Sequence, residues 1–186
     1  MNDLPLRAKH WQLFIFLLAP HLASWYVVDA DAETALNFAG IFLLILWLAM
    51  LVSALSRIKP NISGYNYNWF LIDVFVVLAA FGYGAVANNP EFYITTTSLY
   101  ANGTGGILML YVVFGYLHTH WFPASLLLAK ETNRRPDSLQ TTGLFLAFFF
   151  WPIGIWFVQP RVNKLWDEEQ WQQRAVSKLG AKTPVD

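Results

Sequence analysis

Four long stretches of this chain contain no Lys, Arg, Asp or Glu, and nearly every charged residue lies between them or in the tails. These stretches are Trp11–Val28, Ala35–Ser56, Phe92–Ala129 and Ser138–Pro160. A soluble domain distributes charge along its exposed helix faces, whereas here only 13% of residues are charged and 56% are hydrophobic. The pattern predicts one integral membrane unit that crosses a lipid bilayer several times.

Five apolar segments are candidates for crossing the bilayer, which takes roughly 17–25 residues. Four are long enough: Trp11–Val28, Leu36–Leu55, Trp69–Ala87 and Ile107–Leu128. The fifth, Gly143–Val158, has only about 16 residues and is interrupted by Trp151, Pro152 and Gly154. We therefore expect an all-α bundle of four transmembrane helices, plus a Pro/Gly-broken segment that is either re-entrant or a fifth span. The loop 88–106 allows a short extended stretch.

The distribution of Lys and Arg predicts the orientation of these segments. Basic residues occur in the N-terminal tail, in the second and fourth connections and in the C-terminal tail, but not in the first or third connection. The positive-inside rule then places both termini of a multi-pass inner-membrane protein in the cytoplasm. A fifth full crossing would put the basic C-terminal residues outside, so we expect the last segment to enter and return, bending at Pro152 and Gly154. Residues 1–165 are the predicted transmembrane domain and residues 166–186 a polar cytoplasmic tail.

Several functional classes receive no support from the sequence. The chain has no cysteine and a formal net charge of zero, and it contains no nucleotide-binding loop, nucleophile elbow or metalloprotease motif. We expect no enzymatic activity, no cofactor, no bound metal and no direct nucleic-acid partner.

Ionisable groups inside apolar segments are the remaining candidates for a functional site, because inserting each one at the bilayer centre costs about 2.5–3.5 kcal/mol of free energy. Asp73 lies four residues into its segment. The favoured interpretation is an acid at headgroup depth that pairs with Arg57, Lys59 or Arg135. The alternative is an ion or proton site.

Three histidines extend this candidate site. His21 follows Pro20, so a structural hydrogen bond to a freed backbone carbonyl is favoured over a proton relay. His118 and His120 are two residues apart and should point to different faces of one helix. A site combining His21, Asp73 and one of these histidines would suit zinc or another imidazole-binding metal, but no ligand spacing demands it.

The C-terminal run FFWPIGIWFVQPRVNKL, preceded by the basic hinge KETNRRPDS, resembles a signature of small, uncharacterised bacterial membrane proteins. The matching positions are Pro152, Ile153, Gly154, Ile155, Trp156, Gln159, Pro160, Arg161 and Asn163. The opening Lys9–Phe14 resembles the start of the same proteins. This resemblance implies about four spans and no known activity. Small bacterial membrane proteins of this kind include sensors and effectors of phage defence.

The favoured hypothesis is a non-enzymatic, homo-oligomeric membrane protein acting as a sensor, scaffold or pore-type effector with a soluble cytoplasmic partner. In this hypothesis the last apolar segment is a re-entrant element packed against protein, not a lipid-facing span. Its residues are Trp151, Pro152, Gly154, Gln159, Pro160 and Arg161. A small ion or proton channel or transporter, using Asp73 and the histidines, is the first alternative. A membrane metalloenzyme is the second. Basic residues that would face the cytoplasm are interpreted as ordinary topology rather than as a lipid-headgroup site: Arg57, Lys59, Lys130, Arg134, Arg135, Arg161 and Lys164.

Overall fold

The computed structural model describes residues 4–58, 64–87, 91–95 and 98–180. Within these residues the protein consists of seven helices and one two-stranded antiparallel hairpin. The helices are α1 (Leu4–Arg7), α2 (His10–Ser24), α3 (Ala30–Arg57), α4 (Tyr67–Val86), α5 (Gly105–Thr132), α6 (Ser138–Phe149) and α7 (Trp151–Gly180), and the strands are β1 (Phe92–Ile94) and β2 (Leu99–Ala101). The predicted all-α class and the short extended stretch are confirmed.

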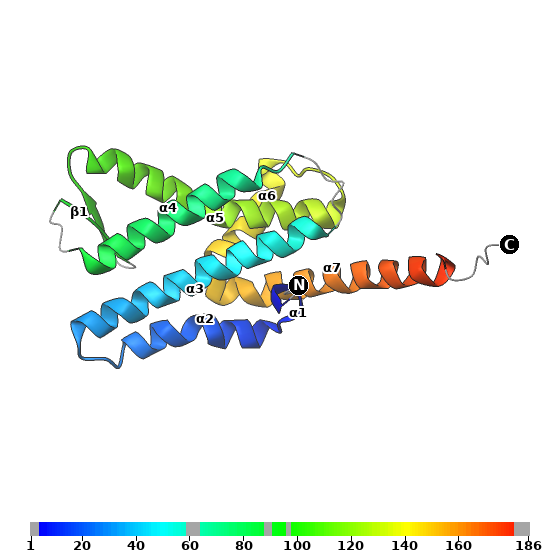
Figure 1. Cartoon of the computed structure of the whole chain (residues 1–186), viewed down its shortest axis with the longest axis horizontal. Helices are drawn as coiled ribbons and strands as arrows, with labels where there is room; N and C mark the ends of the chain where they lie inside the picture. Colours follow the sequence, from blue (N-terminus) through cyan, green and yellow to red (C-terminus); the bar gives the residue numbers. More distant parts are fainter. Residues whose placement is uncertain (1–3, 59–63, 88–90, 96–97, 181–186) are drawn as a thin grey trace.

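Helix α3 is the centre of the bundle. It contacts α1, α2, α4 and α5 (Figure 1). Its core side chains recur every three or four residues, as expected for one buried helical stripe. The fully buried ones are Leu44, Ile45, Leu48, Leu51, Val52, Ala54 and Leu55. The packing of the bundle is therefore organised along the most apolar stretch of the sequence.

The helix boundaries follow from local residue chemistry. The Asp29 side chain accepts a hydrogen bond from the backbone N–H of Ala32 at 2.8 Å and caps α3. Asp137 caps α6 in the same way, accepting from the backbone N–H of Gln140 at 2.7 Å. Helix α5 ends at Thr132 and is capped by Asn133, whose φ of 54° is the left-handed conformation that terminates many helices.

The two ends of the bundle differ in charge. At one end, here called the hairpin end, lie the α2–α3 turn and β1 (Figure 1). At the other end, the α1 end, lie α1 and the last turns of α3 and α5. Acidic Asp29, Asp31 and Glu33 gather at the hairpin end, whereas Arg57 and Lys130 lie in the last turns at the α1 end.

Two described helices, α3 and α4, are long and apolar enough to cross a membrane, and a third candidate arises if α6 and α7 are counted together. Helix α2 has 15 residues, fewer than the segment 11–28 expected from hydropathy, because the chain turns after Ser24 and Trp25 caps the helix. Helix α5 is long enough, with 28 residues, but polar residues such as His118 and His120 lower its mean hydropathy. A bundle of four full spans therefore stays a prediction.

Helices α6 and α7 form a bent pair, with an angle of 119° at the break between them. We expected the bend at Pro152 and Gly154, but the chain turns earlier, at Phe150. Pro152 lies in the first turn of α7, where a missing N–H costs no helical bond. Gly154 permits the close contact instead: a Cβ there would lie 1.6 Å from the Ala147 carbonyl oxygen. The boundary expected at residue 165 falls inside α7, which continues to Gly180.

Candidate functional site

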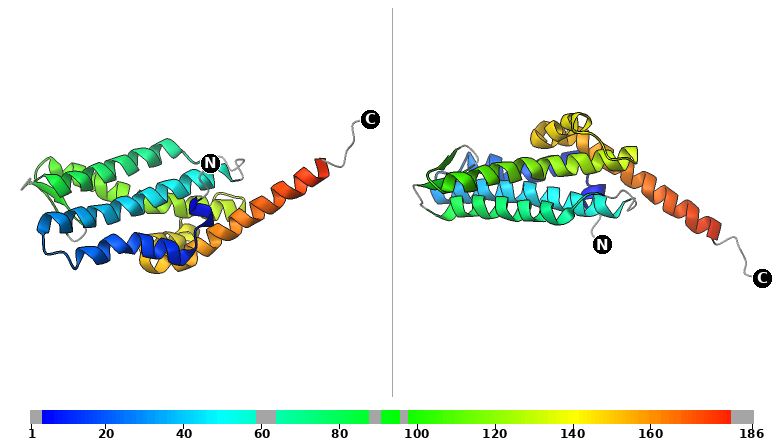
Figure 2. Two further views of the ribbon diagram at one scale, coloured as in Figure 1. Left: turned by 60° about the horizontal axis from the view of Figure 1, so that its bottom comes forward. Right: turned by 90° about the horizontal axis from the view of Figure 1, so that it is seen from above.

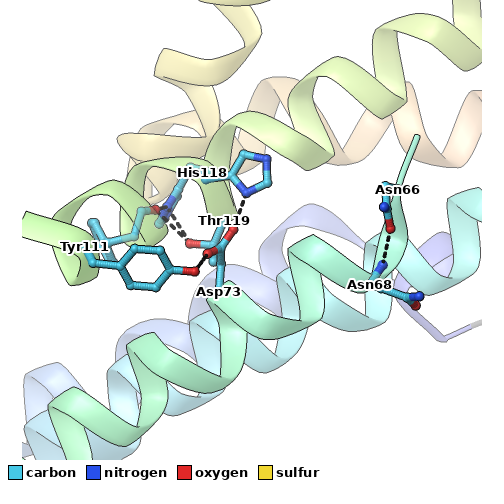
Figure 3. Close-up of polar contacts among 8 residues, drawn as sticks. Asn66, Asn68, Asp73, Tyr111, His118 and Thr119 are labelled. Carbon is cyan, nitrogen blue, oxygen red and sulfur yellow. Dashed lines mark hydrogen bonds and ion pairs between the residues drawn. The ribbon is translucent and has the colours of Figure 1, made fainter. Parts of the chain in front are cut away.

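Asp73 of α4, itself buried, is the centre of a polar cluster (Figure 3). Only 2% of the residue is exposed. The Tyr111 hydroxyl donates to Asp73 Oδ1 at 2.9 Å, and His118 Nδ1 lies 2.6 Å from Asp73 Oδ2. Tyr111 and His118 are seven residues apart on α5, which is two turns, so both side chains project from the same face.

The cluster exists because α4 and α5 approach closely at a glycine. Gly115 lies between Tyr111 and His118 in the sequence, and a Cβ there would be 3.3 Å from Val77 Cγ2 and 3.6 Å from Asp73 Cβ. Small residues allow helix backbones to come near one another in membrane proteins. The spacing Tyr111, Gly115, His118 therefore forms the α5 side of the site.

A cavity of about 440 Å³ opens beside this cluster, within the size range of small-molecule sites. We call it the α4–α5 cavity. Aromatic side chains make up much of its wall, and Asp73, His118 and Arg135 also line it. The Arg135 guanidinium lies 5.8 Å from the centre of the Tyr65 ring. The expected pairing of Asp73 with a basic residue is replaced by bonds to Tyr111 and His118, and Lys59 lies outside the described residues.

The His118 ring is fixed by aromatic neighbours as well as by Asp73. It stacks on Phe114 with ring centres 5.9 Å apart, and Phe122 meets it edge-on at 5.7 Å. When the carboxylate is ionised and the ring neutral, Nδ1 donates to Asp73 and Nε2 is left as an acceptor. The His118 side chain is 26% exposed. The arrangement can therefore take up a proton or accept a hydrogen bond from a ligand.

The other two candidate histidines do not join this cluster. His120 is fully buried, and its Nδ1 lies 2.8 Å from the Tyr116 carbonyl oxygen. His21 packs against Gly40 of α3, where an added Cβ would lie 2.5 Å from the His21 ring. Both histidines are thus packed away from the Asp73 cluster, and the hydrogen bond expected from His21 to a freed backbone carbonyl stays a prediction. No group of three or more His, Asp or Glu side chains that could hold a metal ion occurs among the described residues.

The C-terminal motif forms a second polar arrangement, which holds α7 against the N-terminus. Gln159, fully buried, donates from Nε2 to the Pro5 carbonyl at 2.8 Å and to the Ala8 carbonyl at 2.9 Å. Asn163 Nδ2 also donates to the Ala8 carbonyl, at 3.2 Å. These bonds satisfy the carbonyl of Pro5, in the four-residue helix α1, and that of Ala8, the residue just after it; carbonyls in the last turn of a helix have no partner within the helix.

Arg161 fastens the same helix to α5. Its Nε donates to Glu131 Oε1 at 2.9 Å, and a terminal guanidinium nitrogen bonds Oε2, giving a two-pronged ion pair. We call Gln159, Asn163 and Arg161 the α7 clamp. The sequence predicted a re-entrant element that includes Gln159, Pro160 and Arg161, but not the residues that this element contacts. Pro160 lies inside α7 and is exposed.

Comparisons of this chain with protein-family models, with curated proteins and with solved structures found no match. The resemblance of residues 152–163 to small bacterial membrane proteins therefore stays a prediction. Within this chain, the same residues form the tight turn at Gly154 and the α7 clamp. The chemistry of the site is accordingly inferred from its own side chains.

Proposed function

We propose that this chain is a multi-pass protein of the cell's inner membrane, with α2 to α5 as four spans and α6–α7 as a re-entrant hairpin. The charge difference between the ends supports the orientation. Basic residues at the α1 end face the cytoplasm under the positive-inside rule, and acidic residues such as Asp31 at the hairpin end face outward. Both termini are then cytoplasmic.

The outer surface of the helices supports burial in lipid. Large apolar side chains with high exposure occur on α4, α5, α6 and α7. Among them are Phe75, Ile107, Leu110, Leu139 and Ile153. Exposed apolar surface on this scale is costly in water and favourable against hydrocarbon.

Within this membrane protein, we propose that α7 is the output element of a non-enzymatic, homo-oligomeric sensor or scaffold that contacts a soluble cytoplasmic protein. One observation carries this proposal. Helix α7 is continuous over 30 residues, packs into the bundle through its first half and extends past the α1 end with its second half (Figure 2). The buried stripe is Ile155, Val158, Val162 and Leu165, and no residue from Asp167 to Ala175 is buried.

The α7 clamp supports mechanical coupling between the bundle and the projecting half. Gln159 and Asn163 bond the N-terminal segment, and Arg161 bonds Glu131 near the end of α5. A displacement of α5 or α1 is therefore transmitted to α7 rather than absorbed at a loop. Such a rigid connection suits a sensor, in which a change in the membrane region must reach a partner outside it.

Replacing Trp171 with serine is expected to release the soluble partner without unfolding the protein. Trp171 is 71% exposed on the projecting half of α7, and exposed aromatic residues are the anchors that contribute most to protein interfaces. The measurement is the mass of the complex purified in nanodiscs from the native host. We expect a homo-oligomer with a bound soluble protein for the natural sequence, and the homo-oligomer alone for Trp171→Ser.

Trp25→Ser is the matched control, because Trp25 is similarly exposed, at 77%, but caps the end of α2 at the α2–α3 turn. It should retain the partner. A monomer without a partner for the natural sequence, or equal loss of the partner in both variants, would contradict the role of α7.

A further inference from the structure

The α4–α5 cavity combines a carboxylate with aromatic walls. Asp73, which bonds Tyr111 and His118, and Arg135, which lies beside Tyr65 and Gly64 ahead of α4, both line it. The rings that line the cavity come from both helices and from the segment before α4: Tyr65, Trp69, Tyr111, Phe114, Trp121 and Phe122. Aromatic ring faces carry partial negative charge and attract ammonium groups.

The charge of the Asp73 end reinforces this attraction. The two side chains bonded to Asp73 are Tyr111, which is neutral, and His118, which is neutral when Nδ1 alone carries a proton. Asp73 itself is only 2% exposed, and a buried carboxylate attracts a cation more strongly than a carboxylate in water does. A cationic group is the complement of this end of the cavity.

His118 distinguishes between kinds of cation. With Nδ1 committed to Asp73, Nε2 can accept a hydrogen bond from an N–H of the ligand. A primary ammonium has such hydrogens, and a quaternary ammonium has none. Arg135 lines the same cavity, and a guanidinium binds phosphate or carboxylate groups in a two-pronged geometry.

We propose that the α4–α5 cavity binds a zwitterion that carries a primary ammonium and an anionic group, which is the chemistry of phosphoethanolamine. The ammonium lies between Asp73, His118 and the rings, and the anion lies at Arg135. This chemistry has two sources, a lipid headgroup and a free compound. The proposal does not depend on the role of α7, so either can fail while the other stands.

The first test is calorimetric titration of the purified full-length chain with phosphoethanolamine in an amine-free buffer. We expect saturable binding to the natural protein and binding at least about tenfold weaker for phosphocholine, since about 1.4 kcal/mol corresponds to each factor of ten. Asp73→Asn, which removes the charge but keeps the shape, should lower the affinity by about tenfold or more.

Two further variants separate a binding defect from a folding defect. Trp69 is 60% exposed at the cavity, so Trp69→Leu trims an aromatic wall without creating a buried void and should weaken binding severalfold. Asp31→Asn, an exposed acid at the hairpin end, should bind like the natural protein. Unchanged affinity in Asp73→Asn, or equal affinity for phosphocholine, would overturn the proposal.

Nanodiscs of defined composition distinguish the two sources. Titration in phosphatidylcholine nanodiscs should show binding in either case. If binding disappears in phosphatidylethanolamine nanodiscs and native mass spectra retain that lipid, the occupant is a lipid headgroup. If binding is the same in both, the occupant is a free amine. Absence of saturable binding in phosphatidylcholine nanodiscs and in detergent would refute the site.

Discussion

Replacing Gly154 with alanine is expected to destabilise the protein by about 3 kcal/mol or more, because the added methyl group has no space to occupy. A Cβ at this position would lie 1.6 Å from the Ala147 carbonyl oxygen and 2.4 Å from its carbonyl carbon. Both atoms belong to the backbone, so α6 and α7 must separate to accommodate the change. The expected result is a large fall in the thermal unfolding midpoint in detergent.

Gly143→Ala is the matched control, since Gly143 lies in α6 of the same bent α6–α7 pair and an added Cβ would meet nothing within 4 Å. Alanine there should be neutral or stabilising by up to about 1 kcal/mol, because it favours the helix over the unfolded chain. If Gly154→Ala unfolds at the same temperature as Gly143→Ala, the close approach of α6 and α7 is not required for the fold.

Replacing Gln159 with leucine is expected to lower the free energy of unfolding by about 1–3 kcal/mol, because the buried Pro5 carbonyl loses its donor and the Ala8 carbonyl keeps only Asn163. The affected carbonyls are those of Pro5 and Ala8, which accept from Gln159 Nε2. Because those bonds hold the N-terminus, the loss of structure should begin in the N-terminal segment. Hydrogen–deuterium exchange should show faster exchange at residues 4–8 before the rest of the bundle is affected.

Gln172→Leu is the control for this change, because Gln172 is exposed on the same helix. It should leave both the unfolding midpoint and the exchange of residues 4–8 unchanged. Equal exchange of residues 4–8 in Gln159→Leu and in the natural protein would show that the α7 clamp does not hold the N-terminus.

The apolar segments were predictable because hydropathy and charge are local properties of the sequence. The segments 36–55, 69–87 and 107–128 correspond to α3, α4 and α5 within a few residues, although α3 begins earlier, at Ala30. That early start is encoded by the cap at Asp29 and the acids after it, a signal that a hydropathy count does not include. The position of the turn at Phe150 was missed because the close contact of Gly154 with Ala147 depends on three-dimensional packing.

The candidate site was predictable only in part. The rarity of acids in apolar segments singled out Asp73, but its partners come from another helix 38 and 45 residues away. A single sequence does not say which helices are neighbours. Tyr111 was therefore not predicted as a partner of Asp73, and basic residues were expected instead. The glycine spacing on α5 was a usable signal, since Gly115 between Tyr111 and His118 marks the side of close approach.

The most direct test of the re-entrant arrangement is thiol labelling of single-cysteine variants in intact cells. The chain contains no cysteine, so each introduced thiol is the sole target. Asp31→Cys and Ser177→Cys are both exposed positions, at the hairpin end and on the projecting half of α7. A membrane-impermeant maleimide should label Asp31→Cys in intact cells and Ser177→Cys only after permeabilisation. Labelling of Ser177→Cys in intact cells would mean that the last segment crosses the bilayer, and would contradict a cytoplasmic α7.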